Sequence, residues 1–549
     1  MYDVLLCGGA VLDGTGAAAC RCDVAVQEGK IAAVGDLAGQ KARKVINAAG
    51  KVVTPGFIDI HRHADMEVFR PEFGELELAQ GLTTIVNGNC GLGAAPFGEK
   101  YAREICAYLA PVLGAAEKGV PTASMAAYLS AMEDLPIHVG MLAPNGILRA
   151  DTAGYEKERL DDGDFAAIHK NMEKALESGA LGVSLGLGYA PECFYTTEEL
   201  IRALAPLRGT DIPLTVHMRQ EGGNVVESVA EMMTVARALR CPVHISHLKA
   251  MGRDNWHKKI PAALELLTRA REEGLDVGCD VYPYTAGSTQ LLHILPPDFL
   301  AGGIEGVVRR LQDKTARQEL AARIESGEGF DNIADLAGWD GIYLTSLPDE
   351  RYLGKNIAEI ARMRGQSPVD ACCDLLVEAR GQITMIDFMA AEEDILSILE
   401  SPLSSVISDS TYPTEGNPHP RVYGTFVRII QHFVVEKKAL TLPKAVEKND
   451  LRSGQSFAIA GERGHRSGDG CRYLRICSGG RPGDGYLYPA QTVGTGNGHG
   501  AGSRTGGLGT GTEDLLPRRK GGKERCLIKL LRSSKRRVKS SKTRSRSNG

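Results

Sequence analysis

The chain lacks the sequence features that mark membrane, secreted and disulfide-bonded proteins. No run of about 20 apolar residues occurs in it, so we expect no transmembrane helix. The first residues, MYDVLLCGGAVLDGTG, have neither the basic start nor the long apolar core of a signal peptide. Thirteen cysteines are spread irregularly over 549 residues, which does not suggest a disulfide framework. We therefore expect a cytoplasmic protein with reduced cysteines and no membrane partner.

The C-terminal part lacks the periodicity of helices and strands. Residues 449–549 include the Gly-rich stretch TVGTGNGHGAGSRTGGLGTGT, and from Arg518 onward fourteen lysines and arginines stand against one glutamate. The whole chain nevertheless has a net charge of −4, so the part before this tail is acidic. This composition predicts a disordered, basic tail. A basic arm could bind polyanions, but we expect no specific nucleic-acid partner.

The rest of the chain has two regions. Residues 1–54 contain short β-rich runs separated by glycines, which predict a small antiparallel β-domain. Over residues 55–448, eight apolar strand-like runs alternate with helical segments, and this order predicts an α/β fold, a (β/α)8 TIM-type barrel. The eight runs are residues 56–61, 82–89, 137–144, 181–189, 213–219, 242–249, 275–284 and 404–411. The long gap before the last run predicts a helical insertion at about 290–345.

Most of these runs end in residues that can bind metals or transfer protons, and catalytic residues of this barrel come from the C-terminal ends of several strands. Residues two apart on a strand point to the same side, so the motif HRH places His61 and His63 together and directs Arg62 away. The other polar strand ends are Cys90, Tyr189, His217, His247, Lys249, Asp280, Tyr282 and Asp409. Zinc takes imidazole, thiolate and carboxylate ligands. The set therefore predicts a metal site with the ligands His61, His63, Cys90, His217 and His247.

No single member of this set would carry that prediction. A lone histidine such as His61 is more often a loop residue, and a lone cysteine such as Cys90 is more often a small buried hydrophobe. Asp409 alone could cap a helix or lie in a loop. His244 has the same parity as the site residues but lies deeper in its run, so we expect it in the core or in support of the site. The argument rests on the set.

Six motifs follow one another between residues 55 and 426: PGFIDIHRHAD, NGNCG, HMRQEG, ISHLKAMG, DVYPYTAGST and HPRVYGTF. They resemble the amidohydrolase superfamily and, within it, the N-acyl-D-amino-acid deacylases, or D-aminoacylases. The resemblance extends from residue 1 to about residue 448. It implies zinc-dependent hydrolysis of the amide bond of an N-acyl-D-amino acid to a carboxylate and a free D-amino acid. The D configuration rests on the resemblance alone.

The resemblance also implies roles for the metal ligands. One zinc ion is held tightly by Cys90, His217 and His247. The HRH pair, His61 and His63, contributes to a second and weaker position. Bound zinc lowers the pKa of its water from 15.7 to roughly 7.

Roles toward the substrate follow from the same resemblance. Asp409 in ISDS matches the general base and acid that takes a proton from water and passes it to the leaving amine. The substrate carboxylate is held by Lys249, Tyr282 and Arg421, with Tyr189 nearby. The ammonium group of a lysine and the guanidinium group of an arginine are natural partners for a carboxylate. The alternative for Lys249 and Arg421 is that both are solvated loop charges.

The chain departs from the family pattern at several points. Where the family often has HTHDD, SDG and GHG, this chain has HRHAD, SDS and APNG. Arg62, in the first of these motifs, has no assigned role. In HMRQEG we expect Arg219 and Glu221 to form a structural ion pair beside His217.

Two alternative functions stay open. Cyclic-amide hydrolases of the hydantoinase or dihydroorotase kind commonly bridge two metals with a carboxylated lysine at the end of strand four, but here that strand ends in GLGYAPE, without lysine. The chain could also be an inactive, destabilised remnant. The family continues the helix AVEK as KMTS. The peptide KNDLR can be encoded by a sequence that begins with a run of adenines, and removing one base from that run restores KMTS. We therefore hypothesise that residues from about Asn449 are frame-shifted and that the C-terminal half of a small β-sandwich is missing.

Overall fold

The computed structural model describes residues 1–116, 119–327, 329–449 and 487–489. The hypothesis of a frame-shifted, disordered tail concerns residues that lie almost entirely outside these ranges. None of the helices within the described ranges is both long and apolar enough to cross a bilayer.

Eight parallel strand positions form the predicted barrel. The third position is split into two short strands, of which β8 pairs with β7 and β9 pairs with β10. The barrel closes between its first and last strands through a parallel bridge from Arg62 to Ser410. The barrel strands are β6 (Phe57–Asp59), β7 (Leu82–Asn87), β8 (His138–Met141), β9 (Ala143–Pro144), β10 (Val183–Gly186), β11 (Leu214–His217), β12 (Val243–Ile245), β13 (Val277–Val281) and β17 (Ser404–Val406). The (β/α)8 prediction is confirmed, and the strands are shorter than expected.

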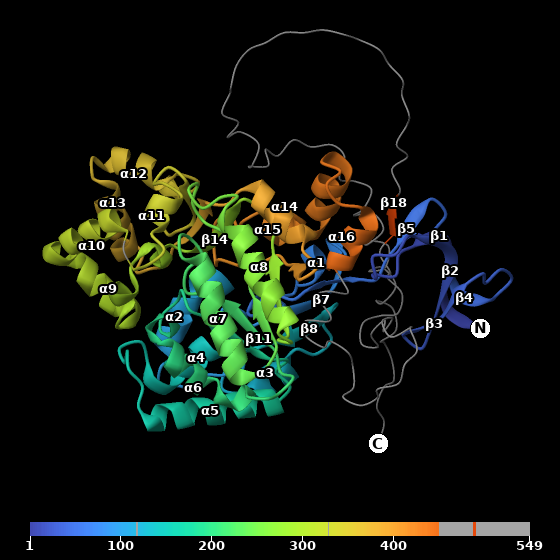
Figure 1. Cartoon of the computed structure of the whole chain (residues 1–549), viewed down its shortest axis with the longest axis horizontal. Coiled ribbons are helices and arrows are strands. Elements are labelled where there is room, and N and C mark those ends of the chain that lie inside the picture. The colour runs from blue at the N-terminus through green and yellow to red at the C-terminus, as the bar shows by residue number, and fades with distance from the viewer. Residues whose placement is uncertain (117–118, 328, 450–486, 490–549) are drawn as a thin grey trace, which may run out of the picture. The chain divides into compact units, whose positions relative to one another are not determined.

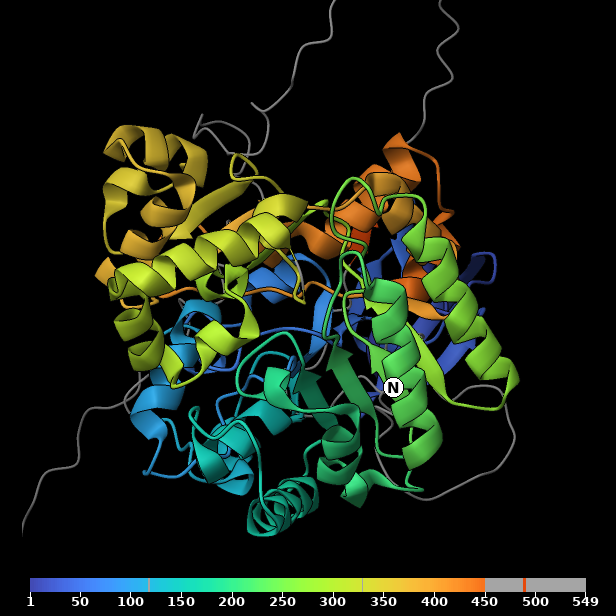
Figure 2. The same ribbon diagram turned by 60° about the vertical axis from the view of Figure 1, so that its left-hand side comes forward.

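Helices follow the strands and cover the outside of the barrel (Figure 2). Some of them begin at a capping side chain; Thr196 and Glu199, for example, form a capping box at the start of α6. The helices are α1 (Glu75–Ala79), α2 (Ala102–Leu113), α3 (Met125–Ala131), α4 (Asn145–Ala153), α5 (Asp162–Glu177), α6 (Thr197–Ala203), α7 (Val225–Leu239), α8 (Lys259–Glu272), α14 (Glu392–Glu400), α15 (Arg421–Arg428), a π-helix (Ile429–Glu436) and α16 (Leu442–Asn449).

The segment between β13 and β17 is longer than the expected insertion and is not only helical. It contains a three-stranded antiparallel sheet in the order β14-β16-β15. The strands are β14 (Ala286–Gln290), β15 (Ile342–Ser346) and β16 (Thr384–Phe388), and the helices, in yellow in Figure 1, are α9 (Gly303–Gln312), α10 (Lys314–Ser326), α11 (Ile333–Leu336), α12 (Ile357–Arg364) and α13 (Pro368–Glu378). The alternating run in β16 carries Asp387 into this sheet.

The N-terminal strands, drawn in blue in Figure 1, form a single sheet in the described residues that also includes the short strand β18, drawn in red. The sheet is mixed and not antiparallel as expected, because β1 pairs in parallel with β4 and β5 and antiparallel with β2. Its strands are β1 (Tyr2–Val11), β2 (Cys20–Gln27), β3 (Lys30–Gly35), β4 (Ala42–Asn47), β5 (Lys51–Val53) and β18 (Leu487–Pro489). Val34 and Val45 on this sheet are exposed.

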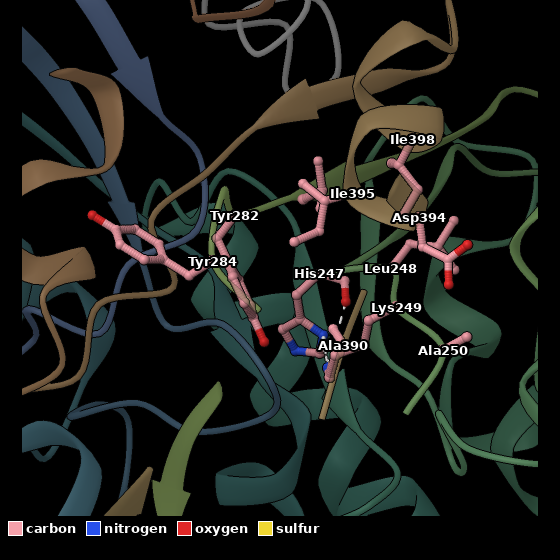
Figure 3. A pocket seen from close by; sticks show the side chains of 11 residues that line it. His247, Leu248, Lys249, Ala250, Tyr282, Tyr284, Ala390, Asp394, Ile395 and Ile398 are labelled. Atoms are coloured by element: carbon pink, nitrogen blue, oxygen red, sulfur yellow. Dashed lines mark hydrogen bonds between the residues drawn. The ribbon is translucent and has the colours of Figure 1, made fainter. Parts of the chain in front are cut away.

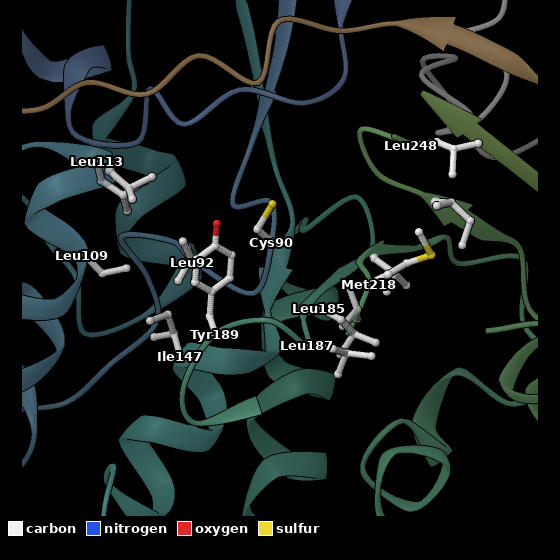
Figure 4. Close-up of a cluster of buried hydrophobic side chains, with 14 of the residues drawn as sticks. Cys90, Leu92, Leu109, Leu113, Ile147, Leu185, Leu187, Tyr189, Met218 and Leu248 are labelled. Atoms are coloured by element: carbon white, nitrogen blue, oxygen red, sulfur yellow. The ribbon is translucent and has the colours of Figure 1, made fainter. Parts of the chain in front are cut away.

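Apolar side chains of the barrel and its helices form one large core. Figure 4 shows that Cys90 and Tyr189 lie among aliphatic side chains such as Leu92 and Leu185. The site described next therefore borders a water-excluding core, which strengthens electrostatic interactions inside it.

Candidate active site

Three residues at the C-terminal ends of barrel strands adopt a left-handed backbone. Cys90 follows β7 with φ 55°, His247 follows β12 with φ 36°, and Asp409 follows β17 with φ 51°. Residues other than glycine rarely take positive φ. Such strain persists only where the surrounding structure imposes it, and it concentrates at active sites. Here it turns three side chains out of the strand direction, toward a common point.

The first group at this point joins the two ends of the closed barrel. The Nε2 atoms of His61 and His63 lie 3.4 and 3.2 Å from Oδ1 of Asp409. The Sγ atom of Cys90 lies 3.2 Å from Nε2 of His61. One ligand atom from each of the four residues falls within 4.8 Å of all the others.

Cys90 also belongs to a second group on the neighbouring strands. Its Sγ atom lies 3.5 Å from Nε2 of His247. His217 is the last residue of β11, and its Nδ1 atom lies 3.0 Å from the same Nε2 atom. Cys90 thus lies between two histidine pairs, and the five predicted ligands are brought together.

The donor set fits a metal ion. Burial lowers the pKa of His61 and of His217 well below the ordinary value, so their imidazoles are neutral and have lone pairs to offer. Burial also raises the pKa of the Cys90 thiol well above its usual range, and a nearby cation would reverse this shift. The Nδ1 atoms of His61 and His63 are buried and have no hydrogen-bond partner. A site of this kind suits a cation that binds nitrogen and sulfur.

Asp409 is ionised in spite of its burial. Burial by itself would raise the pKa of its carboxyl group, but Arg421 and the neighbouring histidines hold that pKa well below its usual range. The Nη1 atom of Arg421 lies 2.8 Å from Oδ2 of Asp409. Arg421, for which a solvated loop position was the alternative, is the buried first residue of α15, where Nη2 also donates to the carbonyl of Ser288 over 2.8 Å.

All the predicted site residues except the fully buried His61 line one cavity. Lys249 is buried and not a solvated loop charge, and Figure 3 shows it with His247 and Tyr282 around an adjoining pocket. The guanidinium of Arg421 lies over the Tyr282 ring, 5.0 Å from its centroid. Tyr189 hydrogen-bonds to Thr289 over 2.9 Å. Two cations and two phenols therefore face the same space as the metal-type ligands.

The expected ion pair between Arg219 and Glu221 is wrong. Arg219 pairs with Glu231 over 2.9 Å on the following helix. Glu221 turns into the site, where its carboxylate lies 2.6 Å from Nζ of Lys249 and 2.9 Å from Nδ1 of His247. Proximity in sequence was a poor guide because a turn after β11 sends residues 219 and 221 in different directions.

Two further residues of the cavity were missed from the sequence. His293 and Asp387 both line it, and both come from the segment inserted between β13 and β17. The ring of His293 lies 4.9 Å from the ring of Tyr189. Neither residue ends a barrel strand, so the strand-end pattern could not find them. An aspartate inside the apolar run ITMIDFM was the available signal for Asp387.

His244 supports the site, which is one of the two roles expected for it. Its Nε2 atom lies 2.9 Å from Oδ2 of Asp280, and the other oxygen of Asp280 accepts the backbone N–H of His247. Asp280 therefore links the strand interior to the strained turn that carries His247.

Arg62 acquires a structural role. Its side chain is fully buried on the side of β6 opposite the two histidines. It donates to Oδ2 of Asp59 over 3.2 Å, to Oε1 of Glu77 over 2.7 Å and to the hydroxyl of Tyr412 over 2.8 Å. A further bond reaches Oγ of Ser408, one residue before Asp409, over 3.1 Å. Arg62 thus ties the first barrel strand to the last, directly behind the site.

Comparisons with known proteins agree with this geometry. A family model described as the amidohydrolase family matches residues 44–449, so the match ends where the sequence was expected to leave the family. A D-aminoacylase of Alcaligenes xylosoxydans xylosoxydans is 32% identical over 463 residues, which cover 84% of this chain and 85% of that protein. An N-acyl-D-glutamate deacylase of the same organism is also 32% identical, with 83% and 84% covered.

Solved structures show the same relationship. The N-acyl-D-glutamate deacylase from Bordetella bronchiseptica, complexed with zinc and a phosphonate inhibitor, is 30% identical and superposes with a TM-score of 0.70, covering 84% of this chain and 86% of that one. A D-aminoacylase described by one-metal activation and second-metal attenuation of a binuclear centre reaches a TM-score of 0.69 with the same identity and coverage. The family match spans most of the chain, and the fold and the cluster of ligand-type residues accord with it. The chain belongs to the amidohydrolase family.

Proposed function

We propose that this chain is a zinc-dependent hydrolase that cleaves the amide bond of N-acyl-D-amino acids. The observation that carries the proposal is the position of Cys90, within ligand distance of both histidine pairs. A thiolate and imidazoles suit zinc better than they suit hard cations. The relatives with zinc or a binuclear metal centre act, by name, on N-acyl-D-amino acids.

The metal would be held by two overlapping sets. Cys90, His217 and His247 would form the tighter position, and His61 and His63 with Cys90 and Asp409 would form the weaker one. When bound, zinc polarises a carbonyl group and makes water a stronger acid.

The proton transfers are assigned to Asp409. Its lowered pKa keeps it ionised before the reaction, and as a carboxylate it can accept the proton of the attacking water while a carbon–oxygen bond forms at the amide carbonyl. The same group then donates this proton to the amide nitrogen as the carbon–nitrogen bond breaks. The products are a carboxylate and a free D-amino acid. Arg421 fixes the orientation of Asp409 through the 2.8 Å ion pair.

The binding of the substrate carboxylate is assigned to Lys249, Tyr282 and Arg421. All three line the cavity beside the metal-type ligands. Lys249 already forms an ion pair with Glu221, and Arg421 forms one with Asp409. The carboxylate of a substrate would therefore meet two cations whose positions are fixed before it binds, which reduces the ordering cost of binding.

Acetate release tests the proposal. Zinc-loaded protein should release acetate from N-acetyl-D-amino acids and not from the L-enantiomers, and treatment with a chelator should remove the activity. The panel is run with hydantoin as a cyclic amide and with a frame-corrected chain beside the present one. Folded, zinc-loaded protein that opens hydantoin but cleaves no N-acetyl-D-amino acid would favour a cyclic-amide hydrolase. Activity in the frame-corrected chain alone would identify the present chain as an inactive remnant.

Replacing Cys90 by alanine should empty both metal positions, because this residue is shared between them. Loss of an outer partner of a metal ligand typically weakens binding by about 10–100-fold, so loss of the shared ligand should exceed this range. Zinc per chain, measured by mass spectrometry after dialysis against a chelator, checks the prediction. Cys279→Ala is the matched control, since Cys279 is a fully buried cysteine on β13 outside both ligand groups. Equal zinc in the two variants would contradict the shared role.

A further inference from the structure

One buried carboxylate in the cavity has no ion-pair partner of its own among the described residues. Asp387 lies on β16 and is 3% exposed, and its side chain lines the cavity with Lys249 and Tyr282. Among the described residues, no other side chain forms a hydrogen bond or an ion pair with its carboxylate; its own backbone N–H forms the hydrogen bond that favours the charged form, and Lys249 and Arg421 attract it from a greater distance. Buried carboxylates are normally paired, because an unpaired one carries the full cost of desolvation.

The two cations that attract Asp387 each form a closer ion pair with another carboxylate. Lys249 pairs with Glu221 over 2.6 Å and Arg421 pairs with Asp409 over 2.8 Å. Asp387 is therefore a third carboxylate beside two cations. Burial raises its pKa to about 6, so the group is still ionised at pH 8. It presents a negative charge to whatever enters this part of the cavity.

A glycine keeps the space in front of Asp387 open. Gly287 on β14 is directly opposite Asp387 in the sheet. A Cβ atom at Gly287 would lie 3.0 Å from Oδ1 of Asp387 and 3.3 Å from the hydroxyl of Tyr282. The same Cβ atom would lie 2.4 Å from the methyl group of Met389. Tyr282 is expected to bind the substrate carboxylate, and the open space beside it is bounded by the carboxylate of Asp387.

The walls of this space are apolar. Met251, Tyr282 and Met389 pack in one buried cluster, and Ile333 of α11 also lines the cavity. Apolar walls that lead to one carboxylate suit a side chain with a methylene stem and a positively charged or N–H-bearing end. An acidic side chain would place a second negative charge beside Asp387 in a water-poor space, where repulsion is strong.

We propose that Asp387 determines the side-chain preference of this enzyme: the cavity takes N-acyl-D-amino acids with a cationic side chain, of the lysine or arginine type, and rejects acidic ones. The proposal rests on the proposed function and deepens it. Overall identity cannot make this distinction, because the chain is 32% identical both to a D-aminoacylase and to an N-acyl-D-glutamate deacylase. In this proposal the charge at residue 387 makes the distinction between cationic and acidic side chains.

Three substrates of similar length test the assignment in the zinc-loaded full chain: N-acetyl-D-lysine, N-acetyl-D-norleucine and N-acetyl-D-glutamate. The expected order of kcat/KM is lysine, norleucine, glutamate. In Asp387→Asn, the advantage of lysine over norleucine should fall by roughly 10–100-fold, the usual strength of a hydrogen bond to a charged group. The glutamate substrate should gain. Asp335→Asn, the same change at an exposed position of α11, should leave the order intact.

The outcomes separate this inference from the function on which it rests. If the enzyme turns over N-acetyl-D-norleucine but Asp387→Asn does not change the order of kcat/KM among the three substrates, the role of Asp387 is overturned and the deacylase function stands. A wild-type preference for glutamate would do the same without any variant, so the test does not depend on the variant folding. No turnover of any N-acetyl-D-amino acid would overturn both.

Discussion

Replacement of Asp409 by asparagine should reduce turnover by about 1000-fold or more while the protein still binds zinc. Positioned acid–base groups contribute roughly 100- to 10 000-fold, and Asp409 is assigned both proton transfers. Asparagine has nearly the same shape but cannot accept the proton of the attacking water. In the proposed assignment the tighter metal position does not include Asp409, since it would be formed by Cys90, His217 and His247. The measurement is kcat for the best N-acetyl-D-amino acid, with zinc per chain determined on the same sample.

The second metal position makes this experiment more informative. Asp409 belongs to the group with His61 and His63, so the variant should lose the weaker zinc and keep the tighter one. Asp335→Asn serves again as the control for a change of charge on the surface. Retained turnover in Asp409→Asn would remove this residue from the chemistry. Loss of both metals would show that it acts first as a ligand.

The strand-end residues could be predicted because local rules determine their place. Apolar runs of strand length specify where barrel strands lie, and parallel strands bring their C-terminal ends to one face. A spacing of two residues was enough to place His61 and His63 together on one side and Arg62 on the other. No long-range information was needed for these assignments.

The residues that were missed depend on contacts distant in sequence. Asp387 reaches the cavity through pairing of β16 with β14, about a hundred positions apart along the chain, and no periodicity predicts which strands of an insertion pair. Glu221 was assigned to its neighbour Arg219, but its partner is Lys249, on the next barrel strand. Short-range charge pairing is a weak rule where a turn separates the two side chains.

Arg62 shows the same limit in the core. Its position pointing away from the histidines followed from strand parity, but its partners Glu77 and Tyr412 come from α1 and from the loop after β17. Five donors of one guanidinium meet a preformed set of acceptors there, which a lysine could not reproduce. The residue that departs from the usual family motif is therefore the centre of a buried network behind the site.

Arg62→Met should lower the free energy of unfolding by about 3–5 kcal/mol, the usual effect of removing one partner from a buried ion pair. The variant leaves Asp59 and Glu77 buried without their cation, and these residues are 0% and 2% exposed. Chemical denaturation monitored by tryptophan fluorescence and circular dichroism measures the change. Arg43→Met is the matched control, because Arg43 pairs with Asp3 on the surface with a side chain 73% exposed; an exposed pair contributes about 1 kcal/mol or less.

A charge-neutral variant separates the burial of charge from the loss of packing. In Arg62→Met combined with Asp59→Asn and Glu77→Gln, no carboxylate is left unpaired, so a large part of the lost stability should return. Activity should recover less than stability, since the bond from Arg62 to Ser408, which precedes Asp409, is still missing. If the triple variant is no more stable than Arg62→Met, the arginine stabilises the barrel through packing alone, and the network of charges behind the site has no energetic role.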